Sequence, residues 1–142
     1  MATLSKPQTN HVQTPLLRRL LATETTRQNA HDSVDEVAEA LSLLLNTRRG
    51  SVAACPEYGL PDFNEFTHMP SQLLKTLERI LVQAIATYEP RLREVKVMGT
   101  MDEDQPDRMC FHINGLMRLG QEQLRVHYRS VLTPEGRVWV KP

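Results

Sequence analysis

The chain has 142 residues, of which 40% are hydrophobic, and its 17 basic and 17 acidic side chains cancel. A chain of this length and composition can bury the core of one domain. The zero net charge disfavours nucleic acid or an anionic membrane as the main partner, because no overall positive field would attract a polyanion. Residues 1–15 lack the apolar core of a signal peptide and no apolar run reaches the length of a membrane span. We therefore expect a cytoplasmic protein without direct membrane insertion, in which Cys55 and Cys110 are reduced thiols.

The N-terminal region divides into an arm and two helical segments. Residues 1–14 are rich in Thr, Gln, Asn and Ser, which predicts a flexible arm outside a single domain of residues 15–142. Leucines and arginines in residues 16–21 favour a short leading helical segment that needs a surface to dock on. Ser33 precedes Glu36 by three residues, a capping pattern, and apolar residues then recur at helical spacing. The first main helix is therefore predicted over residues 33–46.

A long loop and a second helix follow. Glycines and prolines interrupt residues 47–70, so this segment is too broken for a long helix and too irregular for a pair of strands. A strong apolar stripe predicts the second helix from Ser71 to Tyr88. Pro90 ends it, because a proline ring disfavours helical geometry in the residue before it.

Beyond Arg91 the apolar period changes from helical to two, which is typical of strands. A charged loop over residues 102–107, a tight turn near Gly120 and a turn over residues 133–136 separate the strands, the last of which runs from Arg137 to Val140. The expected fold class is α+β, with two main helices packed on one face of a mostly antiparallel β-meander.

Few residues have the pattern of a catalytic or metal site. Carboxylates in the long loop could serve glycoside hydrolysis, but loops are commonly acidic and no aromatic groove accompanies these. Thiols and imidazoles could make a nucleophile and base or a set of metal ligands, yet none has a recognised spacing. The candidates are Glu57, Asp62 and Glu65, then Cys55 with His68, and Cys110 with His112 and His127. A half-exposed polar strand face explains the last group more simply, so we expect no catalytic residue, metal or cofactor.

Three segments stand in a characteristic order: residues 43–50 (LLLNTRRG), residues 58–62 (YGLPD) and residues 88–92 (YEPRL). Together they resemble the TssE family, the small baseplate subunits of bacterial type VI secretion systems. That family is similar to the wedge subunit of contractile phage tails historically called lysozyme-like. The resemblance covers residues 16–140, which leaves only the arm outside.

The resemblance implies a structural role without enzymatic activity. TssE-like proteins lie in baseplate wedges with TssF, TssG and TssK, and face the first ring of the sheath formed by TssB and TssC. In this family the Glu-Pro-Arg segment is associated with contacts inside the assembly, which here implies Glu89, Pro90 and Arg91 as partner-binding residues. We therefore expect Arg91→Ala to weaken assembly while the isolated domain stays folded.

Physical chemistry leaves two interpretations of these residues open. In an extended chain Glu89 and Arg91 project to one side and could orient a charged partner. Alternatively, Arg91 satisfies the last carbonyls of its helix, and Glu89 pairs with Arg93 or with Arg48 or Arg49. Arg48 and Arg49 could themselves bind a partner or only interact with the helix dipole.

Two further sites and two further functions stay possible. The final strand is our choice for a free sheet edge that could accept a strand from another chain, and Trp139 there could be core or interface. An anti-adaptor or regulatory protein-binding module on the same fold is the main alternative function. A cell-wall hydrolase rests only on the loop carboxylates and the inherited family label.

Overall fold

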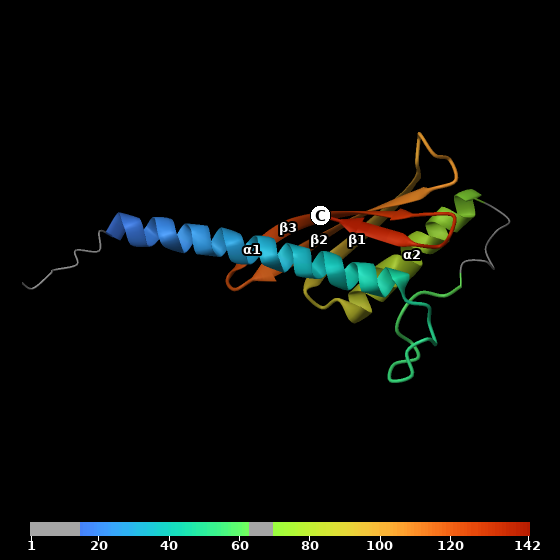
Figure 1. Ribbon diagram of the computed structural model, residues 1–142, viewed down its shortest axis with the longest axis horizontal. Coiled ribbons are helices and arrows are strands. Elements are labelled where there is room, and N and C mark those ends of the chain that lie inside the picture. Colours follow the sequence, from blue (N-terminus) through green and yellow to red (C-terminus); the bar gives the residue numbers. More distant parts are fainter. Residues whose placement is uncertain (1–14, 63–69) are drawn as a thin grey trace, which may run out of the picture.

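The structure, a computed structural model, describes residues 15–62 and 70–142. Two helices precede four strands, in the order α1 (Pro15–Asn46), α2 (Pro70–Tyr88), β1 (Leu92–Met101), β2 (Met109–Leu119), β3 (Glu122–Leu132) and β4 (Val138–Lys141). The strands form one antiparallel sheet in the order β1-β2-β3-β4 (Figure 1). The predicted α+β class and the β-meander are confirmed.

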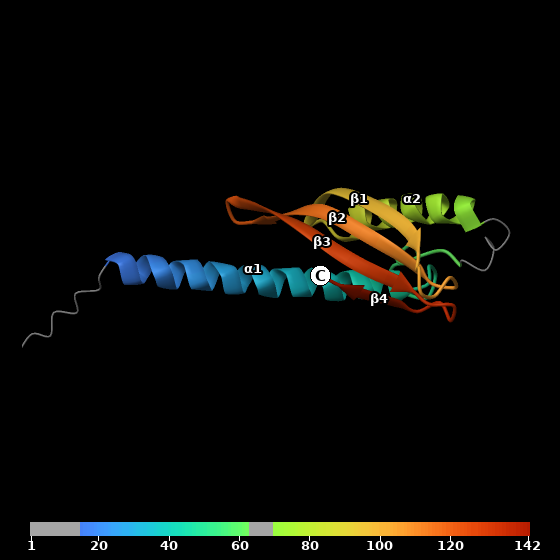
Figure 2. The ribbon, with the colours of Figure 1, turned by 90° about the horizontal axis from the view of Figure 1, so that it is seen from above.

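Helix α1 is one continuous helix of 32 residues, so the prediction of a separate leading segment and a helix start at Ser33 is wrong. The Ser33 hydroxyl donates to the carbonyl of Asn29 at 2.8 Å, a bond within the helix and not a cap. Residues 22–32 contain no glycine or proline, so nothing in this segment stops the helix. Figure 2 shows α1 extending well past the sheet. The predicted arm, residues 1–14, lies outside the described residues.

Helix α2 matches its prediction and begins one residue earlier, at Pro70. Proline is favoured at the first helical position because its missing N–H would have no partner there. The described part of the predicted loop, residues 47–62, forms turns and a single bridge between Arg48 and Leu60. No helix in the described part of the chain is long and apolar enough to cross a membrane.

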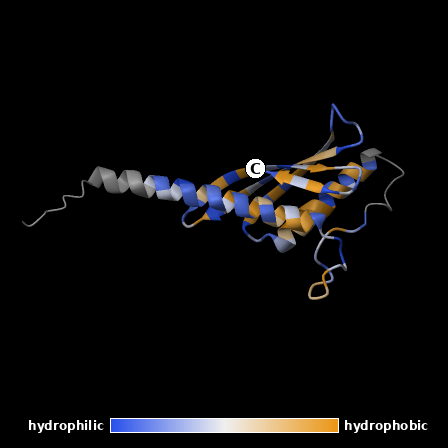
Figure 3. Ribbon diagram, viewed as in Figure 1, coloured by the Kyte–Doolittle hydropathy of each residue, from blue (hydrophilic) through white to orange (hydrophobic). Residues whose placement is uncertain are grey.

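The hydrophobic core is one cluster to which both helices and the sheet contribute. Helix α1 runs beside β4 and α2 along β1 (Figure 2). Hydrophobic residues gather along α2 and where α1 passes the sheet (Figure 3). The fully buried members are Val37, Leu41, Leu44, Leu77, Ile85, Ile113, Met117 and Tyr128.

The sheet has a buried and an open side, set by the alternation of side chains along each strand. Phe111, Ile113 and Met117 of β2 point into the core, whereas His112 and Asn114 between them do not. A β-bulge in β1 shifts the register between Arg93 and Lys96. It explains why the apolar residues of this strand are spaced by three and then by two in the sequence.

Both edges of the sheet are hydrogen-bonded to helix side chains. At the β1 edge, the amide of Gly99 donates to the Glu78 carboxylate of α2 at 2.7 Å. At the β4 edge, the Asn46 side chain accepts from the amide of Val138 at 2.9 Å and donates to its carbonyl at 2.7 Å. The final strand is therefore an edge strand, as predicted, but its first residue is already paired with the end of α1.

Candidate protein-binding site

The segment after α2 turns sharply into the sheet. The Glu89 amide still donates to the Ile85 carbonyl at 2.8 Å, and the Leu92 amide donates back to the Glu89 carbonyl at 3.1 Å. Pro90 lies within this turn and is exposed. The fixed φ of proline suits the change from helix to strand. Pro90 also has no backbone N–H that would need a hydrogen-bond acceptor. The turn therefore sets the positions of the residues on either side of Pro90.

Glu89 and Arg91 bind each other across this turn. The Arg91 guanidinium donates from Nε to Glu89 Oε1 at 2.8 Å and from Nη2 to Glu89 Oε2 at 2.9 Å. The Arg91 amide also donates to Glu89 Oε1, at 3.2 Å. The Glu89 side chain is only 5% exposed and that of Arg91 43%. This two-pronged pair raises the pKa of Arg91, because the bonds to the Glu89 carboxylate favour the charged guanidinium.

The same guanidinium reaches the first helix. Arg91 Nη1 lies 3.3 Å from Glu36 Oε2 on α1. Close by, the Tyr128 hydroxyl of β3 donates to the Val34 carbonyl of α1 at 3.1 Å. Burial, followed by the negative charge of Glu89, raises the pKa of Tyr128 to about 12. We call Glu36, Glu89, Arg91 and Tyr128 the junction, because these side chains join α1, α2 and the sheet.

The junction bears on both interpretations of the Glu-Pro-Arg segment. Glu89 and Arg91 do form an ion pair within the chain. The predicted pairing of Glu89 with Arg93, Arg48 or Arg49 is wrong, since Glu89 binds Arg91. A turn holds the two residues close, which brings them together before any more distant arginine. Pro90 and the exposed part of Arg91 are what a partner could touch, and their partner role stays a prediction.

The other two characteristic segments lie against each other. The Arg49 amide donates to the Leu60 carbonyl at 2.8 Å, and the Leu60 amide donates to the Thr47 carbonyl at 2.8 Å. Arg48 Nη2 lies 3.3 Å from Asp62 Oδ2. Arg48 is thus half of an exposed ion pair, a type that contributes little to stability, and Arg49 is exposed. Both cations remain candidates for partner contact.

Gly59 allows this close approach. Its φ is +105°, a backbone conformation that residues with a Cβ rarely adopt. A Cβ at this position would lie 2.4 Å from the Thr47 carbonyl oxygen. The neighbouring Tyr58 ring meets Tyr88 edge to face, with ring centroids 5.0 Å apart. The three characteristic segments, far apart in the sequence, are therefore linked, because residues 58–62 contact both of the others.

The thiol and imidazole candidates form no metal centre in the described residues, where no three His, Cys, Asp or Glu side chains gather to hold an ion. Cys110 and Cys55 are free thiols. The Cys110 thiol donates to Asp102 at 3.7 Å and accepts from Arg129 at 3.6 Å. His68 and Glu65 lie outside the described residues, as does any pairing with Cys55 that would involve His68.

Two contributors to this site, Glu36 and Tyr128, do not follow from the sequence pattern. Glu36 fitted a capping pattern and was assigned to a helix start, whereas it binds Arg91, 55 residues away. Tyr128 fitted the strand period, which marked it as core but did not reveal its bond to α1. Asn46 belongs to a characteristic segment, and a polar amide at a helix end was the available signal for its bonds to β4.

Tyr128→Phe is expected to remove part of the loss of stability at high pH. A tyrosine whose pKa rises from 10.0 to about 12 on folding stabilises the protein fully below pH 10, and that contribution is lost as the pH rises to about 12. A pKa difference of this size corresponds to about 2 to 3 kcal/mol. Urea unfolding between pH 8 and 12 should therefore show a shallower decline for Tyr128→Phe than for the wild type, and a smaller flattening for Tyr58→Phe, whose pKa burial also raises. Parallel declines in wild type and Tyr128→Phe would contradict the assignment.

The described residues thus form a small α+β fold with exposed cations near a junction whose charges are paired within the chain. A family model described as baseplate wedge protein gp25 matches residues 31–122, well over half of the chain. The chain therefore belongs to the baseplate wedge protein gp25 family, and the resemblance found in the sequence is confirmed at that level.

Two solved structures share the fold. One, from Geobacter sulfurreducens and provisionally assigned as a tail lysozyme, is 21% identical with a TM-score of 0.54, over 67% of this chain and 86% of that one. The other belongs to the baseplate complex from the type VI secretion system and is 22% identical with a TM-score of 0.50, over 75% of this chain and 97% of that one. A comparison with curated protein sequences finds no match to this chain.

Proposed function

We propose that the chain is a non-enzymatic subunit of a type VI secretion baseplate that links wedge components to the first ring of the contractile sheath. The observation that carries this proposal is the contact among the three TssE-like segments, through the Arg48 and Leu60 bridge and the Tyr58 and Tyr88 rings. Membership of the baseplate wedge family supports a structural role in a baseplate. The expected partners are TssF, TssG and TssK, with TssB and TssC of the sheath, in the cytoplasm.

The proposed contact surface consists of exposed groups around the ends of both helices. Arg48, Arg49, Pro90 and the outer part of Arg91 belong to it. Glu89 is buried, so its role is to hold Arg91 in one orientation and not to touch a partner. A guanidinium fixed in this way loses less conformational entropy on binding a carboxylate. The surface therefore favours acidic groups on the partner.

The hydrolase alternative finds little support among the described carboxylates. Asp62 is paired with Arg48 and Glu57 is exposed, so neither lies in the apolar surroundings that a general acid needs. We expect purified protein to release no muropeptides from peptidoglycan.

Arg49→Glu is the variant that tests the proposed function. Arg49 is exposed and its described hydrogen bond uses only its backbone, so the melting temperature should change by no more than about 2 °C. In a host that carries the type VI cluster, sheath assembly and co-purification with baseplate subunits should fall about tenfold, as expected when a central arginine is reversed.

The matched control is Arg79→Glu, which makes the same charge change on the exposed side of α2. It should leave assembly intact. Normal assembly in Arg49→Glu would remove this residue from the contact surface. Co-purification of a single response regulator without any baseplate subunit would instead favour the anti-adaptor alternative over the whole proposal.

A further inference from the structure

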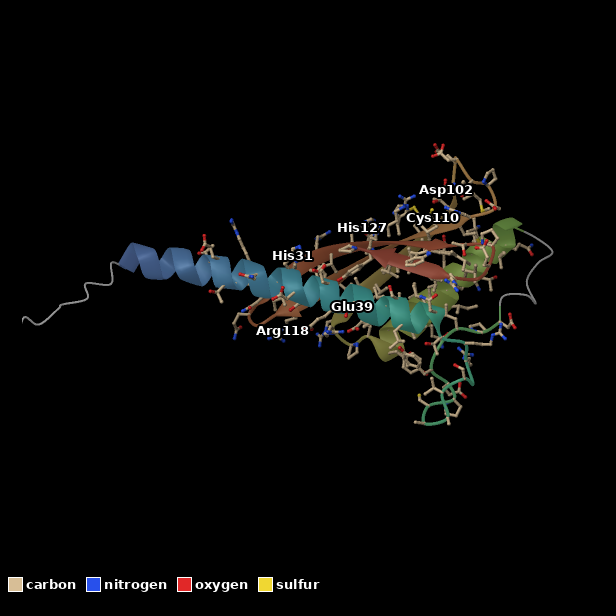
Figure 4. The ribbon with its side chains drawn as sticks, viewed as in Figure 1. His31, Glu39, Asp102, Cys110, Arg118 and His127 are labelled. Carbon is tan, nitrogen blue, oxygen red and sulfur yellow. The ribbon has the colours of Figure 1, made fainter. Side chains whose placement is uncertain are left out.

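The side of the sheet that points away from the core is a surface to which all four strands contribute, and we call it the open face. The strand register aligns its side chains in rows. One row consists of Met98, His112, Arg129 and Lys141, one residue from each strand. His127 and Cys110 also point to this side, and Figure 4 shows them on the side of the sheet away from Glu39 of α1. The open face is therefore continuous from β1 to β4.

Basic side chains dominate the open face. No Asp or Glu occupies a paired strand position with this orientation in the described residues. The cations at such positions are exposed and are Arg93, Lys96, Arg118, Arg125, Arg129 and Lys141. Since basic and acidic residues cancel over the whole chain, positive charge is concentrated on the open face and the described acidic residues lie outside its paired strand positions. A surface of one sign raises the local concentration of groups of the opposite sign.

Two of these cations have partners within the chain. Arg129 lies 4.0 Å from the Asp102 carboxylate, and Arg118 Nε donates to the Gly120 carbonyl at 3.1 Å. Lys96, Arg125 and Lys141 form no ion pair with the described residues. Between them, His112 Nδ1 and His127 Nε2 share a hydrogen bond at 3.2 Å. The middle of the open face is thus polar and cationic.

Two apolar side chains stand at opposite edges of the open face. Met98 on β1 and Trp139 on β4 are each 61% exposed. Four strands place them about 14 Å apart across the sheet, given a spacing of roughly 4.8 Å between strands. Tryptophan is among the residues that dominate protein interfaces. The open face therefore combines cations with apolar anchors at its margins.

We propose that the open face binds an acidic segment of a partner protein, one that also offers an apolar side chain to Trp139. Charge complementarity requires carboxylates opposite Lys96, Arg125 and Lys141, and the anchors require hydrocarbon beside them. Nucleic acid is the less favoured polyanion, because the chain as a whole carries no net charge to attract it from a distance. The inference goes beyond the proposed function, since it uses none of the residues of the proposed contact surface.

Trp139 allows a direct test, because it is the only tryptophan of the chain. A short synthetic peptide of glutamates with a leucine at every fourth position serves as the probe, titrated into the full chain at low salt. We expect the Trp139 emission to shift on binding and the affinity to fall as salt is added, since exposed charges are screened. A peptide with glutamine in place of glutamate and a short DNA duplex are titrated in parallel.

The variant Lys96→Glu with Arg125→Glu should weaken binding of the acidic peptide about tenfold or more, since it places like charges opposite the probe. The matched control Lys75→Glu with Arg79→Glu makes the same charge change on exposed positions of α2 and should leave the affinity unchanged. Circular dichroism on both double variants checks that they are folded.

Three outcomes would overturn the inference. Equal losses in the two double variants would show that net charge and not the open face governs binding. Tighter binding of the duplex than of the peptide at the same salt would make the open face a nucleic-acid surface. Binding of the glutamine peptide as strong as that of the glutamate peptide would show that the cations play no part.

Discussion

Arg91→Ala is expected to lower the free energy of unfolding by about 3 kcal/mol. The substitution removes the cation that faces the Glu89 carboxylate, whose side chain is only 5% exposed. A buried charge left without its partner is far more costly than the pair itself is stabilising. The variant also loses the bond from Arg91 to Glu36 of α1. Urea denaturation, followed by circular dichroism, measures the difference.

Two further variants separate the buried charge from the lost contacts. Glu89→Met with Arg91→Met removes both charges and should be more stable than Arg91→Ala, because no unpaired ion remains. Arg91→Lys keeps the charge but not the two-pronged geometry and should lie between wild type and Arg91→Ala. Equal stability of Arg91→Ala and the wild type would show that the pair contributes nothing. Because Arg91→Ala is expected to lower stability as well as to weaken assembly, functional tests should use Arg49.

Gly59→Ala is the second substitution with a large expected effect, a loss of about 2 to 4 kcal/mol. The added methyl would sit 2.4 Å from the Thr47 carbonyl oxygen, and the φ of +105° is unfavourable for any residue with a Cβ. Relief requires the loop to move away from residues 47–49, which breaks the two bonds between Leu60 and that segment. Urea denaturation and amide hydrogen exchange at Leu60 measure the two consequences.

Gly50→Ala provides a matched control for the backbone contribution. Gly50 also has a positive φ, +85°, but a Cβ there meets nothing within 4 Å. It should therefore cost about 1 kcal/mol, the price of the conformation alone. The difference between the two variants isolates the close approach to Thr47. Similar losses at both positions would mean that the contact is not tight.

Local patterns predicted much of this fold. The apolar stripe of α2 and its stop at Pro90 depend on residues near in sequence, and so do the strand period and the turns of the meander. Helix α1 was divided wrongly, because Ser33 and Glu36 match a capping box that also occurs inside helices. A capping pattern shows that a helix can start there. It does not show that the preceding residues are not helical.

The candidate site was predictable only in part. Glu89 and Arg91 are two residues apart, so their proximity follows from the chain itself. The partners that complete the site come from distant segments, as with Glu36, Tyr128 and the Val138 backbone. Such contacts depend on how the helices pack on the sheet, which periodicity alone does not determine. A polar strand face was predicted around His112, but not the cations of the open face, because they are spread over four strands and align only through the register.

The side chain of Asn46 limits how another strand could pair with the β4 edge of the sheet. A strand arriving beside β4 has to compete with an amide that already satisfies both backbone groups of Val138. This side chain occupies part of the edge with which another copy of the chain could pair, and covering an edge is one way in which sheet proteins protect it. Asn46 is also the last residue of a helix about 48 Å long, at 1.5 Å per residue. Asn46 thus ties the C-terminal end of this helix to the edge strand, and a strand that displaced the Asn46 side chain from Val138 would break that tie.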